Sequence, residues 1–205
     1  MILKTLVLGP LATNCYIVGS EKTGEAMVID PADNAEAILN HAAQLKLEVK
    51  LILLTHAHVD HIGALKEVKD TTGASVAIHE EDAPLLKTNA SRGFMGLSYP
   101  VPPEPDRLLK HRDTINVGNL NFTVLHTPGH TRGSISLYGE GAVFSGDTLF
   151  NGGIGRTDFA GGSYRDIMNS IKSYLLPLPD ETIVYPGHGP DSTIGDEREE
   201  NPFLE

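Results

Sequence analysis

Short apolar runs, each followed by a break that contains Gly, Asn or Pro, recur along the whole chain. Such runs, ending at turn residues, are typical of β-strands. The run from Val49 to Leu54 is apolar except for Lys50, which favours a strand buried on both faces. We expect strands at Leu6–Leu8, Tyr16–Val18, Ala26–Ile29, Val49–Leu54, Ser75–Ile78, Leu120–Leu125, Ile135–Tyr138, Ala142–Phe144 and Thr182–Tyr185.

Four other segments carry apolar residues at helical spacing. In the first of them, Asp33 and Glu36 resemble a capping box, and the following helix ends before Val49. The expected helices follow Asp33, span about His61–Asp70, follow Ser163 as N-cap, and span Thr193–Asn201. Strands that alternate with helices in this way indicate an α/β protein.

The segment Thr88–Asp113 differs from the rest of the chain. It contains four prolines between residues 100 and 105, together with Phe94, Met95, Leu97 and Tyr99 beside glycines. Proline-rich segments do not form regular structure, so we expect a loop. Two interpretations remain open: a surface connection, and an apolar flap over a functional site.

The composition narrows the class of protein further. With 205 residues and 40% hydrophobic residues, the chain is expected to form one domain over residues 1–205. The net charge of -11, with no cluster of Lys and Arg, argues against nucleic acid or an anionic membrane as a partner. No apolar run is long enough to span a bilayer. The one cysteine, Cys15, excludes an intrachain disulfide and favours a cytoplasmic protein.

Candidate functional side chains are concentrated in the segment T-H-A-H-V-D-H at residues 55–61, which contains three imidazoles and a carboxylate. His130, Asp147 and His188 follow later, each just after an apolar run and a glycine. In α/β proteins, functional groups gather where strands end. The candidate metal ligands are therefore His56, His58, Asp60, His61, His130, Asp147 and His188.

These residue types suit two divalent metal ions, with zinc favoured over iron and manganese. In an extended segment alternate side chains share a side, so His56 and His58 are expected to bind one ion together. The turn into the next helix brings Asp60 and His61 towards a second position. Asp147 has two carboxylate oxygens, which makes it the natural bridge between the ions.

The other histidines and the cysteine are assigned to ordinary structural roles. His41, His79 and His111 are expected at or near the surface, whereas His126 is expected to pack behind the metal ligands. Cys15 has no basic neighbour in sequence, so we interpret it as a small buried apolar residue and not as a nucleophile.

The motif T-H-A-H-V-D-H followed by His130, Asp147 and His188 resembles that of the metallo-β-lactamase superfamily of metallohydrolases. The resemblance runs from T-N-C-Y near the N-terminus to N-P-F-L at the end of the chain. It implies a four-layer αββα sandwich. It also implies one metal ion on His56, His58 and His130, a second on Asp60, His61 and His188, and Asp147 as the bridge.

Within that superfamily, F-S-G-D-T-L-F, G-I-G-R-T-D and Y-P-G-H-G-P look most like the small glyoxalase II-like hydrolases. This resemblance implies a thioesterase that cleaves S-acyl (hydroxyacyl) glutathione or a similar thioester with a metal-bridging hydroxide, which Asp60 orients. Arg156 would bind a substrate carboxylate; a surface salt bridge is the alternative role. The full-length enzymes carry a C-terminal helical domain, which we expect to be missing here because the chain ends seventeen residues after His188.

Two other functions remain as alternatives. Persulfide dioxygenases have similar G-R-T-D and N-P elements, and by that resemblance a single iron would be held by His56, His130 and Asp147. A non-catalytic metal-binding protein is the second alternative. β-Lactam hydrolysis is compatible with the resemblance, while nuclease activity is disfavoured by the acidic composition. The expected partner is a small-molecule thioester, and association into a homo-oligomer is left open.

Overall fold

The N-terminal half of the chain folds into a mixed sheet of six strands, in the order β1-β2-β3-β4-β5-β6. The structure is a computed structural model that describes residues 1–90 and 100–204. The pairs β1/β2 and β2/β3 are antiparallel, and the pairs from β3/β4 onwards are parallel. The strands are β1 (Ile2–Leu8), β2 (Thr13–Gly19), β3 (Glu25–Ile29), β4 (Glu48–Leu53), β5 (Ser75–His79) and β6 (Arg107–Leu109).

The C-terminal half forms a second sheet, in the order β14-β13-β10-β9-β8-β7. All its pairs are antiparallel except β10 with β13, which are parallel. The strands are β7 (Thr114–Val117), β8 (Leu120–His126), β9 (Ile135–Gly139), β10 (Ala142–Gly146), β13 (Ile183–Pro186) and β14 (Ser192–Thr193). A small hairpin follows β10 and consists of β11 (Leu149–Phe150) and β12 (Gly153–Ile154).

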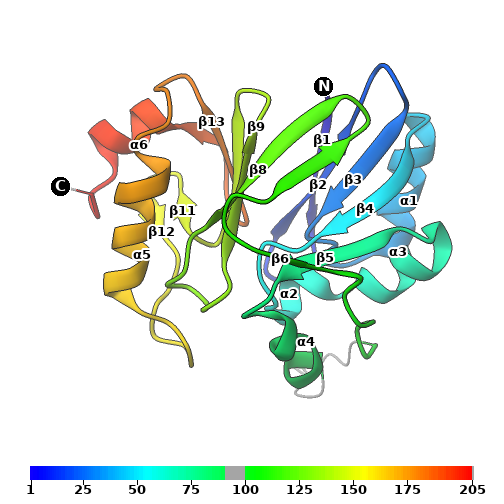
Figure 1. Ribbon diagram of the computed structural model, residues 1–205, viewed down its shortest axis with the longest axis horizontal. Coiled ribbons are helices and arrows are strands. Elements are labelled where there is room, and N and C mark those ends of the chain that lie inside the picture. The colour runs from blue at the N-terminus through cyan, green and yellow to red at the C-terminus, as the bar shows by residue number, and fades with distance from the viewer. Residues whose placement is uncertain (91–99, 205) are drawn as a thin grey trace.

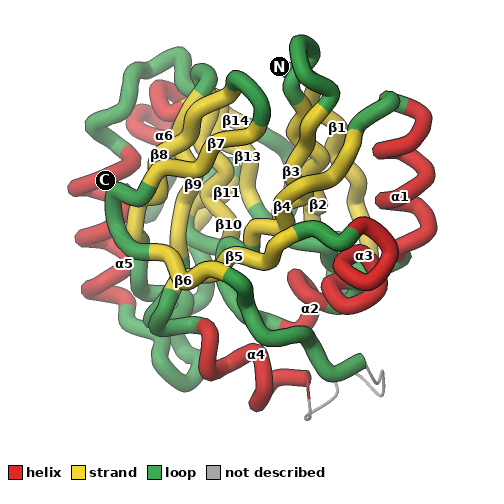
Figure 2. Tube along the Cα trace, turned by 45° about the vertical axis from the view of Figure 1, so that its right-hand side comes forward, coloured by secondary structure: helices red, strands yellow, loops and turns green. Residues whose placement is uncertain are grey.

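Helices cover the outer faces of both sheets, so the two sheets face each other in the middle of the molecule (Figures 1 and 2). The helices are α1 (Ala35–Gln44), α2 (Val59–Ile62), α3 (Leu65–Thr72) and α4 (Ala83–Ala90) beside the first sheet, and α5 (Tyr164–Ser170), its π-helical continuation η1 (Ile171–Leu175) and α6 (Ile194–Glu200) on the second. This arrangement is the four-layer αββα sandwich, as the sequence predicted.

Strand β2 shows how the sequence specifies these layers. Successive side chains of a strand point to opposite faces. Cys15 and Ile17 pack with the apolar side chains under α1 and α3, whereas Tyr16 and Val18 pack between the two sheets. Every residue of β2 is buried, because both faces of its sheet are covered. A third apolar layer lies between the second sheet and α5 and α6.

Two details of the predicted helices are wrong. The cap of α1 is Asn34, whose side chain accepts a hydrogen bond from the Ala37 amide, while Asp33 accepts from the amide of Asn34 instead. The single helix expected over residues 61–70 is two helices, α2 and α3. The chain breaks between them because the amide of Ala64 donates to the carbonyl of Pro31 outside the helix (2.9 Å). Ser163 and Thr193 cap α5 and α6.

The segment Thr88–Asp113 is more regular at its two ends than predicted. Residues 88–90 complete α4, and residues 107–109 form β6 at the edge of the first sheet. The apolar residues on which the flap interpretation rested lie in 91–99, outside the described residues. Strand β7 was also missed, because only two of its four residues are buried and its apolar pattern is weak.

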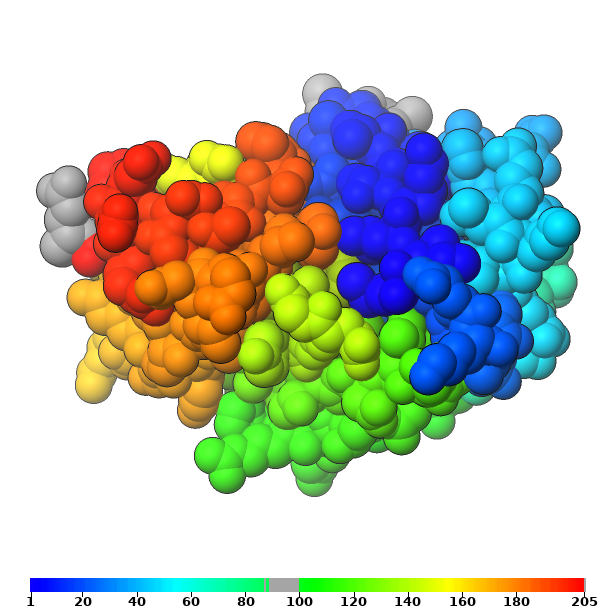
Figure 3. All heavy atoms as spheres, turned by 90° about the horizontal axis from the view of Figure 1, so that it is seen from above, coloured from blue at the N-terminus to red at the C-terminus, as the bar shows by residue number. Residues whose placement is uncertain are grey.

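The two halves of the chain meet along the face seen in Figure 3, where N-terminal residues in blue lie beside C-terminal residues in orange. A β-bridge between Thr13, the first residue of β2, and His188, just after β13, joins the two halves. No helix within 1–90 and 100–204 has the length and apolar character needed to cross a membrane.

Candidate metal centre

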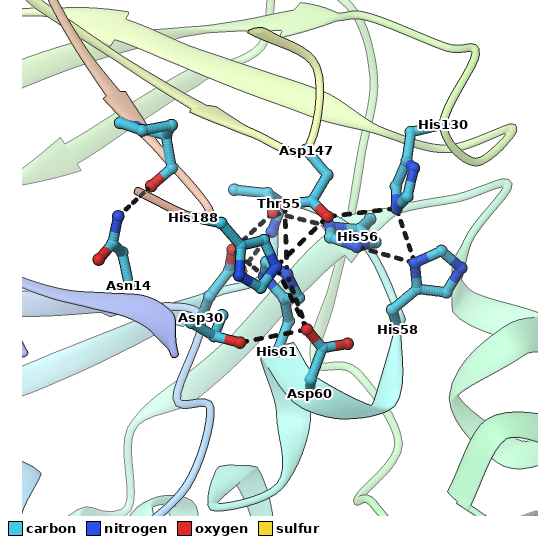
Figure 4. Close-up of polar contacts among 12 residues, drawn as sticks. Asn14, Asp30, Thr55, His56, His58, Asp60, His61, His130, Asp147 and His188 are labelled. Atoms are coloured by element: carbon cyan, nitrogen blue, oxygen red, sulfur yellow. Dashed lines mark hydrogen bonds and ion pairs between the residues drawn. The ribbon is translucent and has the colours of Figure 1, made fainter. Parts of the chain in front are cut away.

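The side chains that the sequence singled out meet where strands of both sheets end (Figure 4). Strand β4 leads into residues 55–61, and β8, β10 and β13 lead into the turns that carry His130, Asp147 and His188. Functional groups of open α/β sheets gather at the carboxyl ends of strands, and this centre follows that rule. The fold therefore unites residues that are up to 132 positions apart, from His56 to His188.

A glycine precedes each of the three distant residues, and a Cβ at any of the three would lie 2.5 Å or less from a neighbouring atom. Gly129 has a φ of 137°, and a Cβ there would lie 2.2 Å from the amide nitrogen of Ile167. At Gly187 a Cβ would lie 2.1 Å from Asp147 Oδ1. Larger residues would displace the neighbouring chain, so the P-G-H turns let the chain bring its imidazoles into the centre.

His56, His58 and His130 form the first group. Nδ1 of His58 lies 3.1 Å from Nε2 of His56 and 2.7 Å from Nε2 of His130. The three nitrogens lie within 4.8 Å of one another, a spacing suited to one metal ion. His56 and His130 are buried, while His58 is partly exposed at the edge of the group.

Asp60, His61 and His188 form the second group, within the same limit of 4.8 Å. Asp60 Oδ2 lies 3.6 Å from His61 Nε2 and 3.4 Å from His188 Nε2. His61 is fully buried, and the other two side chains are partly exposed. The first turn of helix α2 carries Asp60 and His61 to this position.

Asp147 lies between the two groups. Its Oδ2 is 3.4 Å from His130 Nε2 in the first group and 3.6 Å from His188 Nε2 in the second. Its Oδ1 is 3.4 Å from His61 Nε2. A carboxylate whose oxygens lie within 3.6 Å of nitrogens of both groups is placed to bridge two metal ions.

The ring nitrogens that point away from the centre are held by carbonyl groups. His130 donates from Nδ1 to the carbonyl of Arg156 (2.7 Å), and His188 donates from Nδ1 to that of Leu11 (3.1 Å). A carbonyl can only accept, so each ring carries a proton on Nδ1 and turns Nε2 towards the centre. Histidines that bind metals usually have their second nitrogen held in this way.

Two of the inward-facing atoms lack a hydrogen-bond partner among the described residues and fit a metal. His61 Nε2 and Asp147 Oδ1 are buried, and neither makes a hydrogen bond within the described part of the chain. Buried polar atoms are costly when no partner compensates for lost water. A ring nitrogen and a carboxylate oxygen that face one another at 3.4 Å need a cation between them, either a proton or a metal ion. The donor set therefore fits divalent ions.

Electrostatics acts on these groups in opposite directions. Burial lowers the pKa of His61, but the charges of Asp147 and Asp30 raise it well above the usual value, so a metal ion has to displace a proton there. Burial, followed by the charge of His130, lowers the pKa of His58 to about 4. Burial raises the pKa of Asp147, but the charges of His61 and His130 lower it by more than this. The net pKa of Asp147 therefore lies below the usual range. At neutral pH His58 is neutral and Asp147 is charged, the forms that coordinate metals.

Asp30 belongs to this centre and was missed by the sequence analysis. Its Oδ2 accepts from His61 Nδ1 (2.8 Å) and from the hydroxyl of Thr55 (2.6 Å), and its Oδ1 accepts from the Thr55 amide (2.8 Å). The signal in the sequence was a carboxylate directly after a strand. Asp30 follows β3, just as Asp147 follows β10.

Arg156 lies beside the first group and is already paired. Its guanidinium donates to both carboxylate oxygens of Asp158 (3.0 and 2.8 Å) and stacks on the ring of Phe159, 4.2 Å from the ring centre. The pair is about two-thirds exposed. The Phe159 ring in turn lies 5.5 Å from that of His58. The salt-bridge role predicted as the alternative is therefore present, although the pair stands next to the centre.

The remaining histidines lie outside the centre. His79 was expected at the surface, which is wrong: it is 4% exposed because its ring stacks on that of His126, with centroids 4.0 Å apart. His126 packs behind the His130 turn and contacts the carbonyl of Arg132, in agreement with its predicted supporting role. His41 and His111 are partly exposed. Cys15 is fully buried, as predicted.

The αββα sandwich and the histidine and aspartate centre at its strand ends define a class of metal-dependent hydrolases. The chain belongs to the metallo-beta-lactamase superfamily, whose family model matches residues 8–188.

Relatives and solved structures agree with this assignment. The chain is 38% identical to the hydroxyacylglutathione hydrolase GloC of Haemophilus influenzae, over 93% of this chain and 92% of GloC. It is similar to the crystal structure of the BLEG-1 B3 metallo-beta-lactamase, with 41% identity, a TM-score of 0.93 and coverage of 99% of both chains. It is also similar to TTHA1623 in a di-iron-bound form, with 40% identity, a TM-score of 0.90 and coverage of 98% and 100%. TTHA1623 thus shows that a protein of this fold can hold two metal ions.

Proposed function

We propose that this protein is a dinuclear metal-dependent thioesterase that hydrolyses S-acyl glutathione, such as a hydroxyacyl glutathione, or a similar thioester. The observation that carries the proposal is the position of Asp147, which reaches two separate groups of three ligands. A structural metal site is closed and needs four ligands for one ion, whereas a pair of three-ligand groups leaves positions open for substrate and water. The name of the GloC relative supports the choice of substrate.

In this proposal His56, His58 and His130 hold one ion, and Asp60, His61 and His188 hold the other. Asp147 bridges them. Zinc remains the favoured metal for this set of nitrogen and oxygen ligands, and the di-iron form of TTHA1623 supports iron as the alternative.

Bound divalent metals supply a nucleophile at neutral pH, by lowering the pKa of a water molecule, and polarise a carbonyl oxygen. The chain supplies position and proton handling. Asp60 Oδ2 is fixed by the hydroxyl of Thr13 (3.1 Å) and lies at the partly exposed side of the second group. There its carboxylate orients the attacking water. Water adds to the thioester carbonyl, the C–S bond breaks, and the thiol leaves with a proton.

Arg156 and Phe159 form the wall next to the first group and bind the substrate outside the reacting atoms. Phe159 offers an apolar ring 5.5 Å from that of His58, and Arg156 offers a cation to a carboxylate of the thiol carrier. Because Arg156 is paired with Asp158, a substrate carboxylate has to compete with that side chain.

The low cysteine content supports a cytoplasmic location, where thiol carriers are reduced. The net charge of -11 is unfavourable for nucleic acid and anionic membranes. A small thioester is therefore the proposed partner.

Three substrates tested side by side distinguish this proposal from its rivals. Metal-loaded protein is assayed with S-lactoylglutathione, with a chromogenic cephalosporin, and with glutathione persulfide in an oxygen electrode. The proposal predicts turnover of the thioester well above that of the other two. Faster opening of the β-lactam, the activity suggested by the name of BLEG-1, would replace the thioesterase assignment. Oxygen consumption by an iron-loaded sample would favour the persulfide dioxygenase, and turnover of none of the three would favour a non-catalytic metal-binding protein.

A further inference from the structure

Asp82 is a buried carboxylate outside the two ligand groups, between β5 and α4. It accepts three hydrogen bonds: from the amide of Ala57 (2.9 Å), the amide of Gly133 (2.7 Å) and the hydroxyl of Thr131 (2.9 Å). Burial raises the pKa of Asp82, and these donors oppose the shift. Three donors aimed at one carboxylate favour its charged form, which can only accept.

The partners of Asp82 are the immediate neighbours of the first ligand group. Ala57 stands between His56 and His58, and Thr131 follows His130 directly. The two segments come from different sheets, one after β4 and the other after β8. Asp82 is thus a single side chain that ties together both segments on which the first group depends.

The fit around Asp82 is tight. A Cβ at Gly133 would lie 2.5 Å from the Asp82 amide nitrogen and 2.7 Å from Oδ1. The glycine lets its segment approach closely enough for its amide to donate to the carboxylate. Small changes in this contact will be transmitted to His130, three residues earlier.

Asn14 has the equivalent position for the second group. Its side-chain amide donates to the carbonyls of Pro186 and Gly189 (both 2.9 Å), and its backbone amide donates to the carbonyl of Gly187 (2.7 Å). These three carbonyls flank His188 on both sides in sequence. Asn14 is 3% exposed and belongs to neither ligand group.

We propose that Asp82 and Asn14 are positioning residues that set the metal affinity of the two groups separately. Asp82 acts on the group of His56, His58 and His130, and Asn14 acts on the group that contains His188. This inference rests on the proposed metal centre and does not depend on the identity of the substrate. Supporting residues of this kind commonly change metal affinity by roughly 10- to 100-fold.

Asp82→Asn tests the proposed role of Asp82 with almost no change in side-chain volume. An amide has one accepting oxygen, so in either orientation its NH2 group faces an amide donor of Ala57 or Gly133. Asn14→Ala removes both side-chain donors from the His188 turn. Each variant is the matched control for the other. Thr131→Val removes one donor from Asp82 and keeps the carboxylate, so it tests the same contact if Asp82→Asn does not fold.

The experiment measures zinc binding without any substrate. Metal-free proteins are titrated with zinc against a chromophoric chelator, and anomalous scattering from zinc-loaded crystals gives the occupancy of each group. We expect Asp82→Asn to weaken one of the two zinc affinities roughly 10- to 100-fold, with the loss at the first group, and Asn14→Ala to do so at the second. Thr131→Val should give a smaller loss at the first group.

Thermal unfolding of the metal-free variants separates positioning from a purely structural role. Equal loss of zinc from both groups in proportion to lower stability would overturn the inference, as would unchanged affinities in either variant. Wild-type protein that binds no zinc would overturn it together with the metal centre. Two bound zinc ions without thioester hydrolysis would contradict only the proposed function.

Discussion

Asp30 Oδ2 accepts a hydrogen bond from His61 Nδ1 at 2.8 Å, and both side chains are buried. This contact holds a proton of His61 on Nδ1 and turns Nε2 towards Asp147, 3.4 Å away. Asp30 is held in turn by two bonds from Thr55. The second ligand group is therefore oriented by a carboxylate that does not itself face the substrate.

Asp30→Asn should weaken metal binding in the second group. The amide keeps the shape but has one accepting oxygen in place of two, so it cannot accept all three bonds from His61 and Thr55. We expect a loss of zinc affinity of roughly 10- to 100-fold for one of two ions. The measurement is a zinc titration of the metal-free protein, with the exposed change Glu36→Gln as control. Wild-type affinity in Asp30→Asn would show that His61 is oriented by other contacts.

Asp147→Asn should lower metal content and hydrolytic activity together. An amide carries no charge and bridges two cations poorly, so both groups lose a ligand at once. We expect kcat/KM to fall by more than about 100-fold, beyond the effect of residues that only support ligands. Metal analysis by mass spectrometry and thioester kinetics on the same sample test this. Two ions retained at full activity would refute the bridging role.

Arg156→Ala should raise KM for anionic thioesters about tenfold and leave kcat little changed, because a contact shared by ground state and transition state is lost. Arg165→Ala, an exposed arginine on α5, is the control. Asp158→Asn should move KM in the opposite direction, since it frees the Arg156 guanidinium from its present partner. If Arg156→Ala and Asp158→Asn both keep the wild-type KM, as the control should, the Arg156 pair is only a surface salt bridge.

Cys15 should be unreactive in the folded protein. Burial raises the pKa of its thiol far above the usual value, so the thiolate that reacts with disulfide reagents is not formed. A group with a raised folded pKa stabilises the fold below its unfolded pKa, about 8.5 for a thiol, and this contribution is lost as pH rises further. Native protein should not be labelled by an aromatic disulfide at pH 8, whereas urea-unfolded protein should react once per chain.

The same argument predicts that the urea concentration at the midpoint of unfolding decreases as the pH is raised from 8 to 10. The decrease should be smaller in Cys15→Ala. Equal falls in both proteins would assign the alkaline loss to other groups.

Local pattern was enough to predict much of the fold. The alternation in β2 assigns Cys15 and Tyr16 to different layers, and the caps at Ser163 and Thr193 mark the starts of α5 and α6. Strand β7 was not predictable in this way, because it has only four residues and only two of them are apolar. The break between α2 and α3 depends on a contact with Pro31, which is distant in sequence.

The same distinction applies to the centre. The ligands stand in short motifs with strand ends and P-G turns, so sequence could single them out. Asp30 and Asp82 could not be recognised, because their roles come from contacts with residues 25 or more positions away. Their signal, an acidic residue at the end of a strand, is common in loops and becomes specific only once the partners are known.

The number of metal ions needed for thioester hydrolysis tests the central claim most directly. Metal-free protein is given zinc in steps, and bound zinc and the rate of S-lactoylglutathione hydrolysis are measured at each step. We predict that activity reaches its maximum only at two bound ions per chain, because the ligands form two groups joined by Asp147. Full activity with one bound ion, or with none, would contradict a dinuclear centre.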